Sequence, residues 1–234
     1  MKKTLFPDYE SLSKAAAERL LEQTKENPAL RICLATGSSP TRCYELYVDF
    51  IGREGCNTEQ MTVVKLDEWG GMNETHEGSC EYYIRKYFNG PLGIPPERYL
   101  SFRADLDDPG QECARISKAL KQAGGLDVSV LGLGLNGHLG FNEPAESMQP
   151  FAHVANLSAE SQQHSMMAGA CAKPTYGLTL GMAELLQSKL IILIVNGTKK
   201  KAQLERLMSM RVDPQFPATF LWLHPNVELY CDIE

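Results

Sequence analysis

Residues 190–195 read Leu-Ile-Ile-Leu-Ile-Val, the longest uninterrupted aliphatic run in the chain, and residues 196–201 follow as Asn-Gly-Thr-Lys-Lys-Lys. Six apolar residues are too few to span a membrane. A short run that is apolar at every position is typical of a strand buried on both of its faces. We therefore expect a buried strand at 189–195, followed by a glycine turn and a helix with a basic start.

Strand-like and helix-like segments alternate on both sides of this run. Further strands are expected at 31–35, 61–66, 99–102, 127–131, 176–180 and 227–231, and helices at 8–27, 40–54, 79–88, 110–123, 182–187 and 198–208. This alternation predicts an α/β fold in three layers, with a mainly parallel, Rossmann-like sheet and helices on both faces. No repeat or linker divides the chain, so residues 1–234 are expected to form a single domain.

The composition excludes several classes of protein. The chain is 43% hydrophobic and 22% charged, with a formal net charge of −6, which is ordinary for a globular domain and unlike a disordered chain or a coiled coil. A weakly acidic protein gains nothing from its overall charge when it meets nucleic acid or an anionic membrane. We therefore expect neither partner, and a bound anion must be held at a local site.

The cysteines and the start of the chain indicate the compartment. The seven cysteines are odd in number and form no Cys-x-x-Cys pair, which favours free thiols in a reducing compartment. Met1-Lys2-Lys3 is followed by Pro7-Asp8-Tyr9-Glu10 and not by the apolar stretch of a signal peptide. We therefore expect a cytoplasmic protein.

Two loops that follow strands are candidates for an anion site, because ligands of open α/β sheets bind outside the carboxyl ends of the strands. Residues 36–41, Thr-Gly-Ser-Ser-Pro-Thr, combine a tight turn with hydroxyl groups and the amides of a helix start. Residues 199–201 add three lysines after the strand at 189–195. Taken singly, an ordinary capped turn and a solvated basic helix face explain the same residues.

A third loop offers a candidate base. Asp67, Glu68 and Trp69 follow the strand at 61–66. Adjacent side chains of an extended chain point to opposite sides, so at most one of the two carboxylates faces a given site. A carboxylate at a strand end can act as a general base, although a helix cap or a surface acid is the alternative interpretation.

The fourth loop, residues 132–144, reads Gly-Leu-Gly-Leu-Asn-Gly-His-Leu-Gly-Phe-Asn-Glu-Pro. It formally matches the Gly-x-Gly-x-x-Gly dinucleotide fingerprint, but that motif needs a helix directly after it, and Pro144 argues against a long one. A glycine-shaped loop that presents His138 and Glu143 is the better interpretation, since histidine titrates near neutrality and suits proton transfer. The five histidines show no metal-binding spacing, and no Gly-x-Ser-x-Gly elbow occurs.

Together, the four loops predict proton-transfer chemistry on a phosphorylated small molecule, and their motifs resemble a known family. The order of the motifs is typical of the amino-sugar-phosphate deaminase/isomerases, and the resemblance extends from about residue 8 to residue 232. Residues 64–69, 131–140 and 220–224 resemble the galactosamine-6-phosphate branch most. The resemblance implies conversion of galactosamine 6-phosphate and water into tagatose 6-phosphate and ammonia, without a metal or an organic cofactor.

The resemblance also implies roles for individual residues. His138 assists opening of the pyranose ring, with Glu143 in support, and Asp67 moves a proton from C2 to C1 through an enol-type intermediate. Asn136 stands where glucosamine-6-phosphate deaminases have Asp. The phosphate and substrate contacts are expected at Gly37, Ser38, Ser39, Gly137 and Lys200.

One position departs from the family pattern. The family's phosphate-binding Arg in the segment after Glu143 has no counterpart among residues 158–167, Ser-Ala-Glu-Ser-Gln-Gln-His-Ser-Met-Met. His164 and Arg42 are the candidate replacements. The allosteric phosphate site, the lid and the hexamer of regulated relatives are therefore not implied, and we expect a monomer or a small homo-oligomer.

Three alternatives remain. A glucosamine-6-phosphate deaminase differs only in the C4 epimer, which no residue in the sequence identifies. A 6-phosphogluconolactonase is disfavoured by Asp67 and by the Phe-Asn-Glu-Pro segment at 141–144. A non-catalytic sugar-phosphate sensor is disfavoured because it needs neither Asp67 nor His138, and because the chain begins at the first expected helix with no room for a DNA-binding module.

Overall fold

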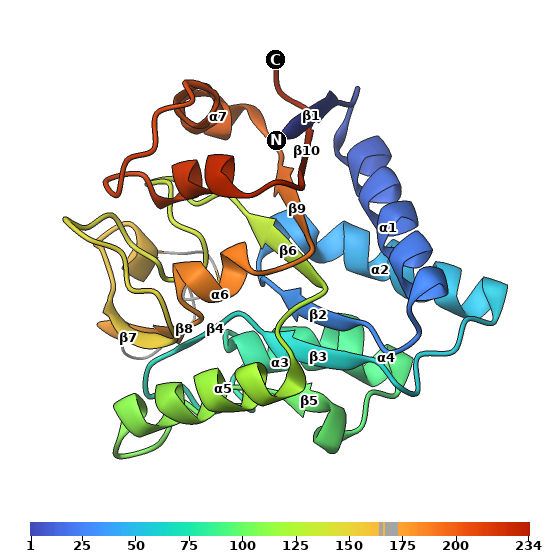
Figure 1. Cartoon of the computed structure of the whole chain (residues 1–234), viewed down its shortest axis with the longest axis horizontal. Coiled ribbons are helices and arrows are strands. Elements are labelled where there is room, and N and C mark those ends of the chain that lie inside the picture. The colour runs from blue at the N-terminus through green and yellow to red at the C-terminus, as the bar shows by residue number, and fades with distance from the viewer. Residues whose placement is uncertain (164–165, 167–172) are drawn as a thin grey trace.

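The computed structural model describes residues 1–163, 166 and 173–234. Its main sheet has seven strands, and every pairing in it is parallel (Figure 1). The strands lie in the order β1 (Lys2–Leu5), β10 (Val227–Cys231), β9 (Leu190–Val195), β6 (Val128–Gly132), β2 (Arg31–Leu34), β3 (Thr62–Lys65) and β5 (Tyr99–Leu100). The predicted α/β fold with a mainly parallel sheet is confirmed.

Helices cover both faces of this sheet, as predicted (Figure 1). One face packs against α1 (Tyr9–Glu26), α2 (Ser38–Glu54) and α3 (Cys80–Ile84), and the other against α5 (Pro109–Ala123), α6 (Met182–Leu186) and α7 (Lys201–Met208). Strand β9 shows why its sequence is apolar throughout. Alternate residues, beginning with Leu190 and Ile191, enter the two opposite hydrophobic cores, and every β9 residue is buried.

A second, smaller sheet is antiparallel and lies beside the first. Its order is β4 (Asp67–Trp69), β8 (Tyr176–Thr179) and β7 (His153–Asn156). Only Leu66 separates the end of β3 from the start of β4, so the chain passes from the large sheet to the small one at this point. Asp67 pairs with Thr179. The expected loop at 67–69 is therefore a short strand, and the expected strand at 176–180 belongs to the small sheet.

Two further strands and several irregular turns were not predicted. Strand β1 is mostly exposed and polar, and it exists because it pairs with β10 at the edge of the large sheet. Strand β7 pairs with β8 in the small sheet. The expected helix at 79–88 is divided. Among the described residues, the other short helical elements are a π-helical turn at Arg85–Asn89, α4 (Gly90–Leu92), and 3-10 turns at Pro96–Arg98, Ser161–Gln163, Thr198–Lys200 and Pro217–Leu223.

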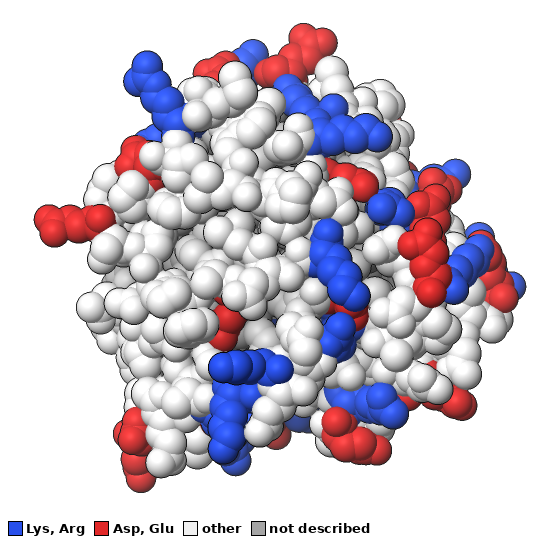
Figure 2. Space-filling view, viewed as in Figure 1, with Lys and Arg blue, Asp and Glu red and all other residues white. Residues whose placement is uncertain are grey.

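The surface of the face seen in Figure 1 carries charges of both signs. Lys and Arg side chains lie beside Asp and Glu at several places on this face, with uncharged residues between them (Figure 2). In the part of the chain that is described, no helix has the length and apolar character needed to cross a membrane.

Candidate active site

The four loops singled out in the sequence converge on one cavity of about 850 Å³. They follow β2, β3, β6 and β9, and these strands run in the same direction in the same sheet, so their carboxyl ends meet at one edge. Residues of the segment after β7, including Glu160, Ser161, Gln163 and Met166, line another side of the cavity.

One end of the cavity is suited to an anion. Gly37 has a φ of +108° and precedes the first turn of α2, which no side chain caps in the described structure. The free amides and the positive end of the helix dipole therefore face this region. Lys200 Nζ donates to Ser39 Oγ at 3.3 Å, and Ser39 Oγ donates to Asn196 Oδ1 at 2.7 Å. Burial lowers the pKa of Lys200 to about 8, and a bound anion would restore its preference for the charged form.

Asp67 lies on the cavity wall at the start of β4 and is only 7% exposed. Its carboxylate Oδ1 accepts a long contact of 3.8 Å from the thiol of Cys80. Burial and the negative charge of Glu68 raise the pKa of Asp67 to about 7, although the charges of His138 and Lys65 and the thiol contact act in the opposite direction. A carboxylate that changes charge near neutral pH suits a general base.

The loop that carries His138 needs glycine at two positions. A Cβ on Gly134 would lie 2.0 Å from the imidazole ring, so the ring packs directly over the backbone there. Gly137 has a φ of +88°, and a Cβ on it would lie 2.2 Å from Phe216. Buried Asn142 secures the far end of the loop, since its Nδ2 donates to the carbonyls of Leu139 and Leu180 at 2.9 and 2.8 Å.

His138 is held by three polar side chains. Its Nδ1 lies 3.4 Å from Glu143 Oε1 and 3.2 Å from Ser161 Oγ, and Ser161 also donates to the same Glu143 oxygen. Asn136 Nδ2 donates to Glu143 Oε2 at 2.6 Å, and Asn136 Oδ1 accepts from the His138 backbone amide at 3.1 Å. These contacts direct Nδ1 toward Glu143, which leaves Nε2 as the ring nitrogen for exchanging a proton with a bound molecule.

The environment of Glu143 keeps this carboxyl group ionised. Burial alone would raise its pKa, but the hydrogen bond and charge of His138, together with hydrogen bonds from Ser161 and Asn136, outweigh burial and lower the pKa below its ordinary value. Asn136 can donate to Glu143, whereas an aspartate at this position would place two carboxylates in contact. Asn136 is therefore compatible with an ionised Glu143 beside it.

The structure brings most of the predicted site residues together. Those that line the cavity are Gly37, Ser38, Ser39, Asp67, Asn136, His138 and Lys200. Glu143 is connected to the cavity through its contact with His138. Gly137 is not among the described residues that line the cavity. With its positive φ, Gly137 forms the turn that positions the neighbouring His138. His164 lies outside the described residues.

Arg42 does not fill the place of the missing arginine, and that expectation is wrong. Its guanidinium donates to both carboxylate oxygens of Glu10 at 2.7 and 2.8 Å and to Glu45 at 3.2 Å. Arg42 belongs to α2, and its ion pair with Glu10 connects α2 to α1. Arg42 is not a lining residue of the cavity.

Two residues of the site were missed in the sequence. Ser161 contacts both members of the His138–Glu143 pair, and Cys80 contacts the Asp67 carboxylate. A single serine or cysteine carries no sequence pattern that identifies such a contact, because the fold alone brings it to its partner. Within the described residues, no three His, Cys, Asp or Glu side chains are grouped so that they could hold a metal ion.

Known proteins resemble this chain over nearly its full length. The chain is 40% identical over 219 residues to the "Putative deaminase AgaI" of Escherichia coli (strain K12), with 94% of this chain and 87% of that protein covered. It is 31% identical over 231 residues to glucosamine-6-phosphate deaminase of Bacillus pumilus (strain SAFR-032), with 98% and 96% covered.

Solved structures also resemble this chain over nearly its full length. A monomeric glucosamine-6-phosphate deaminase matches with a TM-score of 0.92 and 30% identity, covering 99% of this chain and 97% of that one. The 6-phosphogluconolactonase of Thermotoga maritima matches with a TM-score of 0.78 at 15% identity over 100% and 99% of the two chains, and shares the fold. The family model described as "Glucosamine-6-phosphate isomerases/6-phosphogluconolactonase" matches residues 7–230. The chain therefore belongs to the family of glucosamine-6-phosphate isomerases and 6-phosphogluconolactonases.

Proposed function

We propose that this protein is an amino-sugar-phosphate deaminase that converts galactosamine 6-phosphate and water into tagatose 6-phosphate and ammonia. The observation that carries the proposal is the meeting, in one cavity, of a carboxylate that titrates near neutrality, a histidine held by a carboxylate, and a lysine at a helix start. These are Asp67, His138 and Lys200. Similarity to a deaminase-named relative and to glucosamine-6-phosphate deaminases supports the same reaction class.

The phosphate group of the substrate binds at the start of α2. The backbone amides of residues 38 and 39, the Ser39 hydroxyl and the Lys200 ammonium surround this end of the cavity. A phosphate dianion gains from the helix dipole and from the Lys200 ammonium, whose hydrogen bond goes to the Ser39 hydroxyl and whose pKa is shifted by burial alone. Binding at this end leaves the sugar ring to extend toward Asp67 and His138.

Proton transfer takes place at the other end of the cavity. His138 moves a proton between the ring oxygen and the C1 hydroxyl, which opens the pyranose ring. Asp67 in its ionised form removes the C2 proton of the open aldehyde and returns it to C1. The electron pair of the C2–H bond forms the C1–C2 double bond of an enol-type intermediate, while the carbonyl pair moves onto the C1 oxygen, which takes up a proton from water. When Asp67 returns its proton to C1, the nitrogen lone pair forms the C2–N double bond of an iminium group.

Water completes the reaction without a further reagent. It adds to C2 of the iminium group, and the C2–N bond then breaks as ammonia leaves with its electron pair. The C2 oxygen becomes the ketone of the product. One water is consumed and one ammonia is released, so the overall reaction involves no change in oxidation state summed over C1 and C2.

The decisive measurement is ammonia release from galactosamine 6-phosphate and glucosamine 6-phosphate at equal concentrations, with 6-phosphogluconolactone hydrolysis measured alongside. We expect ammonia from both amino sugars, with the larger kcat/KM for galactosamine 6-phosphate. A larger value for glucosamine 6-phosphate would correct the epimer and retain the reaction. Lactone hydrolysis without ammonia release would replace the proposal with a hydrolase.

The setting of the reaction is also a proposal. We place it in the cytoplasm, where the six described cysteines, all free, stay reduced. Residues 1–234 are proposed to act as one domain, since the seven-stranded sheet takes its strands from Lys2 to Cys231 and both hydrophobic cores pack against it.

A further inference from the structure

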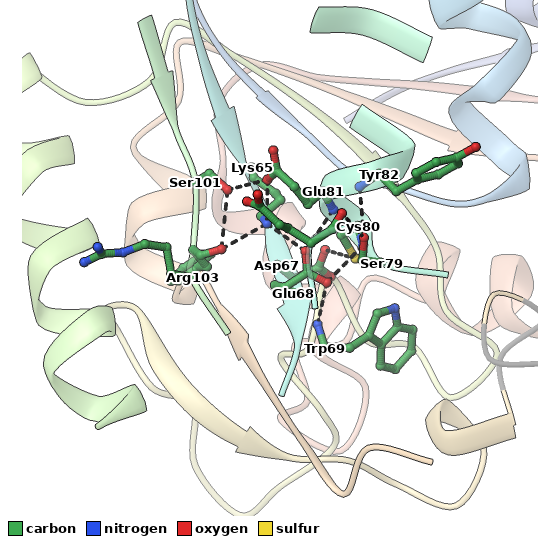
Figure 3. A network of polar contacts seen from close by, with 12 residues as sticks. Lys65, Asp67, Glu68, Trp69, Ser79, Cys80, Glu81, Tyr82, Ser101 and Arg103 are labelled. Carbon is green, nitrogen blue, oxygen red and sulfur yellow. Dashed lines mark hydrogen bonds and ion pairs between the residues drawn. The ribbon is translucent and has the colours of Figure 1, made fainter. Parts of the chain in front are cut away.

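On the side of β4 away from the cavity, the buried charged side chains of Lys65, Glu68 and Glu81 form a hydrogen-bonded network (Figure 3). At its centre is Lys65 of β3, which is 1% exposed. The Lys65 ammonium donates three hydrogen bonds, to Glu68 Oε2 at 2.7 Å, to Glu81 Oε2 at 2.9 Å and to the carbonyl of Phe102 at 3.0 Å. An ammonium group has three N–H donors, so the lysine is fully satisfied.

Glu68 connects this lysine to the backbone of two elements. Its Oε1 accepts from the amides of Trp69 and Cys80, both at 2.9 Å, and its Oε2 accepts from the amide of Glu81 at 2.8 Å. The side chain therefore ties β4 to the first turn of α3. Glu68 is 2% exposed, and both of its carboxylate oxygens accept two hydrogen bonds.

The same contacts determine what surrounds the Asp67 carboxylate. Glu68 follows Asp67 directly in β4, and it holds the amide of Cys80, whose thiol lies 3.8 Å from Asp67 Oδ1. Thr36 Oγ1 contacts the Cys80 sulfur at 3.3 Å from the loop after β2. The backbone before and after the reactive carboxylate and the thiol beside it are thus fixed by one set of contacts.

We propose that Lys65, Glu68 and Glu81 form a positioning network for Asp67, which holds its carboxylate in the cavity wall and sets the electrostatic field that this carboxylate experiences. The inference rests on the proposed function, in which Asp67 moves the C2 proton. Lys65 and Glu68 are positioning residues, because they act on the substrate only through Asp67.

The charged and titratable groups around Asp67 come from every element packed against it. Negative charge comes from Glu68 on β4, and positive charge from Lys65 on β3 and from His138 in its protonated form. Cys80 on α3 lies within contact distance, and Cys33 on β2 and Tyr44 on α2 lie near enough to interact; burial raises the pKa of each of these three groups well above neutrality, so all are uncharged there. Lys65 and Glu68 therefore act on Asp67 in opposite directions.

The test measures the titration of Asp67 in the whole protein. Protein labelled with carboxyl-¹³C aspartate gives one resonance per aspartate, and the Asp67 resonance is the one missing from Asp67→Asn. In Lys65→Met we expect the titration midpoint to move to higher pH by about one pH unit, and in Glu68→Gln to lower pH by about the same amount. Lys65→Arg, which keeps the charge, should stay close to wild type.

Activity supplies a second, independent measurement. The acidic limb of the kcat/KM profile for ammonia release should move in the same opposite directions in Lys65→Met and Glu68→Gln. The exposed ion pair of Lys14 and Glu18 provides matched controls. Lys14→Met and Glu18→Gln should leave both midpoint and profile unchanged.

A purely structural role for the network would lower stability and activity in both variants without opposite movements of the midpoint, and that outcome overturns the proposal. If Lys65→Met fails to fold, the proposal is tested with Glu68→Gln and with the double variant Lys65→Met/Glu68→Gln. The Asp67 midpoint should fall in Glu68→Gln and should return toward the wild-type value in the double variant. The ¹³C titration needs no turnover. If the midpoints shift but the protein releases no ammonia, the proposed function is refuted and the network is retained. If the protein releases ammonia but the midpoints do not shift, the network is refuted and the proposed function is retained.

Discussion

Two lysines, the buried Lys65 and the partly buried Lys200, show how differently this chain treats charge on the two sides of β4. Lys65 donates to two carboxylates and a carbonyl, and although burial lowers its pKa, the charges of Glu68 and Glu81 outweigh burial and raise it. Lys200 donates to the hydroxyl of Ser39, and burial lowers its pKa to about 8. All three N–H donors of Lys65 find acceptors within the folded chain, whereas Lys200 is the lysine that we propose to pair with the substrate phosphate.

The carboxylates repeat this contrast. Burial would raise the pKa of Glu81, but Lys65, Ser101 and Arg85 outweigh burial and lower it to about 2. Burial and a neighbouring negative charge raise the pKa of Asp67 to about 7. The pKa values of Lys65 and Glu81 behind β4 are therefore shifted toward their charged forms, whereas Asp67 and Lys200 in front of it change protonation near neutral pH, as the proposed proton transfer requires.

The largest expected effect is on the cavity side, in Asp67→Asn. Loss of the general base should lower kcat for ammonia release about 10³-fold and abolish deuterium incorporation at C1 of the product in D₂O. Binding of the sugar phosphate should persist, because Lys200 and the start of α2 are untouched. The exposed Asp107 offers the control variant Asp107→Asn. Retained deuterium incorporation in Asp67→Asn would remove Asp67 as the base.

On the network side, Glu81→Gln should act on stability. Leaving the buried Lys65 with one carboxylate should lower the free energy of unfolding in urea by about 3 kcal/mol at pH 7. The pKa of Glu81 is depressed in the folded state, so its contribution is present above the ordinary glutamate pKa and is lost as the pH falls toward 2. The difference between the variant and wild type should therefore narrow in acid. The exposed Glu97 provides the control, Glu97→Gln.

Asp67→Asn should have the opposite effect on stability from Glu81→Gln. The pKa of Asp67 is higher when folded than when unfolded, so wild type loses stability as the pH rises from the ordinary aspartate value through about 7. Asparagine removes this dependence. The variant should gain about 2 to 3 kcal/mol relative to wild type between pH 5 and pH 8, measured by urea unfolding at both pH values. A constant difference would show that Asp67 carries no raised pKa.

The smallest effect expected is on phosphate binding. Lys200→Met should raise KM for the sugar phosphate about tenfold, the value of one charge-assisted hydrogen bond, and should leave the unphosphorylated amino sugar unaffected. Because the Lys200 charge is lost as the pH rises through about 8, KM of wild type should rise above pH 8 and that of the variant should not. Lys201 is exposed in the same segment, and Lys201→Met is the control. Equal KM values in the two variants would contradict the assigned phosphate site.

The elements that the sequence predicted correctly are those whose signal is local. Strands such as β9 are apolar at each position because both faces are buried. Helix α5 begins at Pro109 after an Asp108 cap and ends at Ala123, before the left-handed Gly124. The elements that were missed depend on distant partners. Strand β1 exists through β10, more than 220 residues later, and β4 through β8.

The site shows the same division. Asp67, His138, Glu143 and Lys200 stand in motifs next to predicted strand ends, and the expectation that only one of Asp67 and Glu68 faces the cavity is confirmed. Ser161 and the Lys65 network could not be foreseen, because a hydroxyl or a lysine acquires such contacts only through tertiary packing. Arg42 was misjudged for a related reason, since the sequence does not show that Glu10 lies beside it.

The single residue between β3 and β4 has a consequence for insertions and deletions. Successive β4 side chains point to opposite faces, so a shift by one position exchanges them. One added residue after Leu66 would send the Asp67 carboxylate toward Lys65 and the Glu68 carboxylate toward the cavity. Point substitutions here alter one side of the strand at a time, whereas a change in length would exchange the two environments. We therefore expect any insertion or deletion between Lys65 and Asp67 to abolish activity, whereas a substitution at either position changes only one side of the strand.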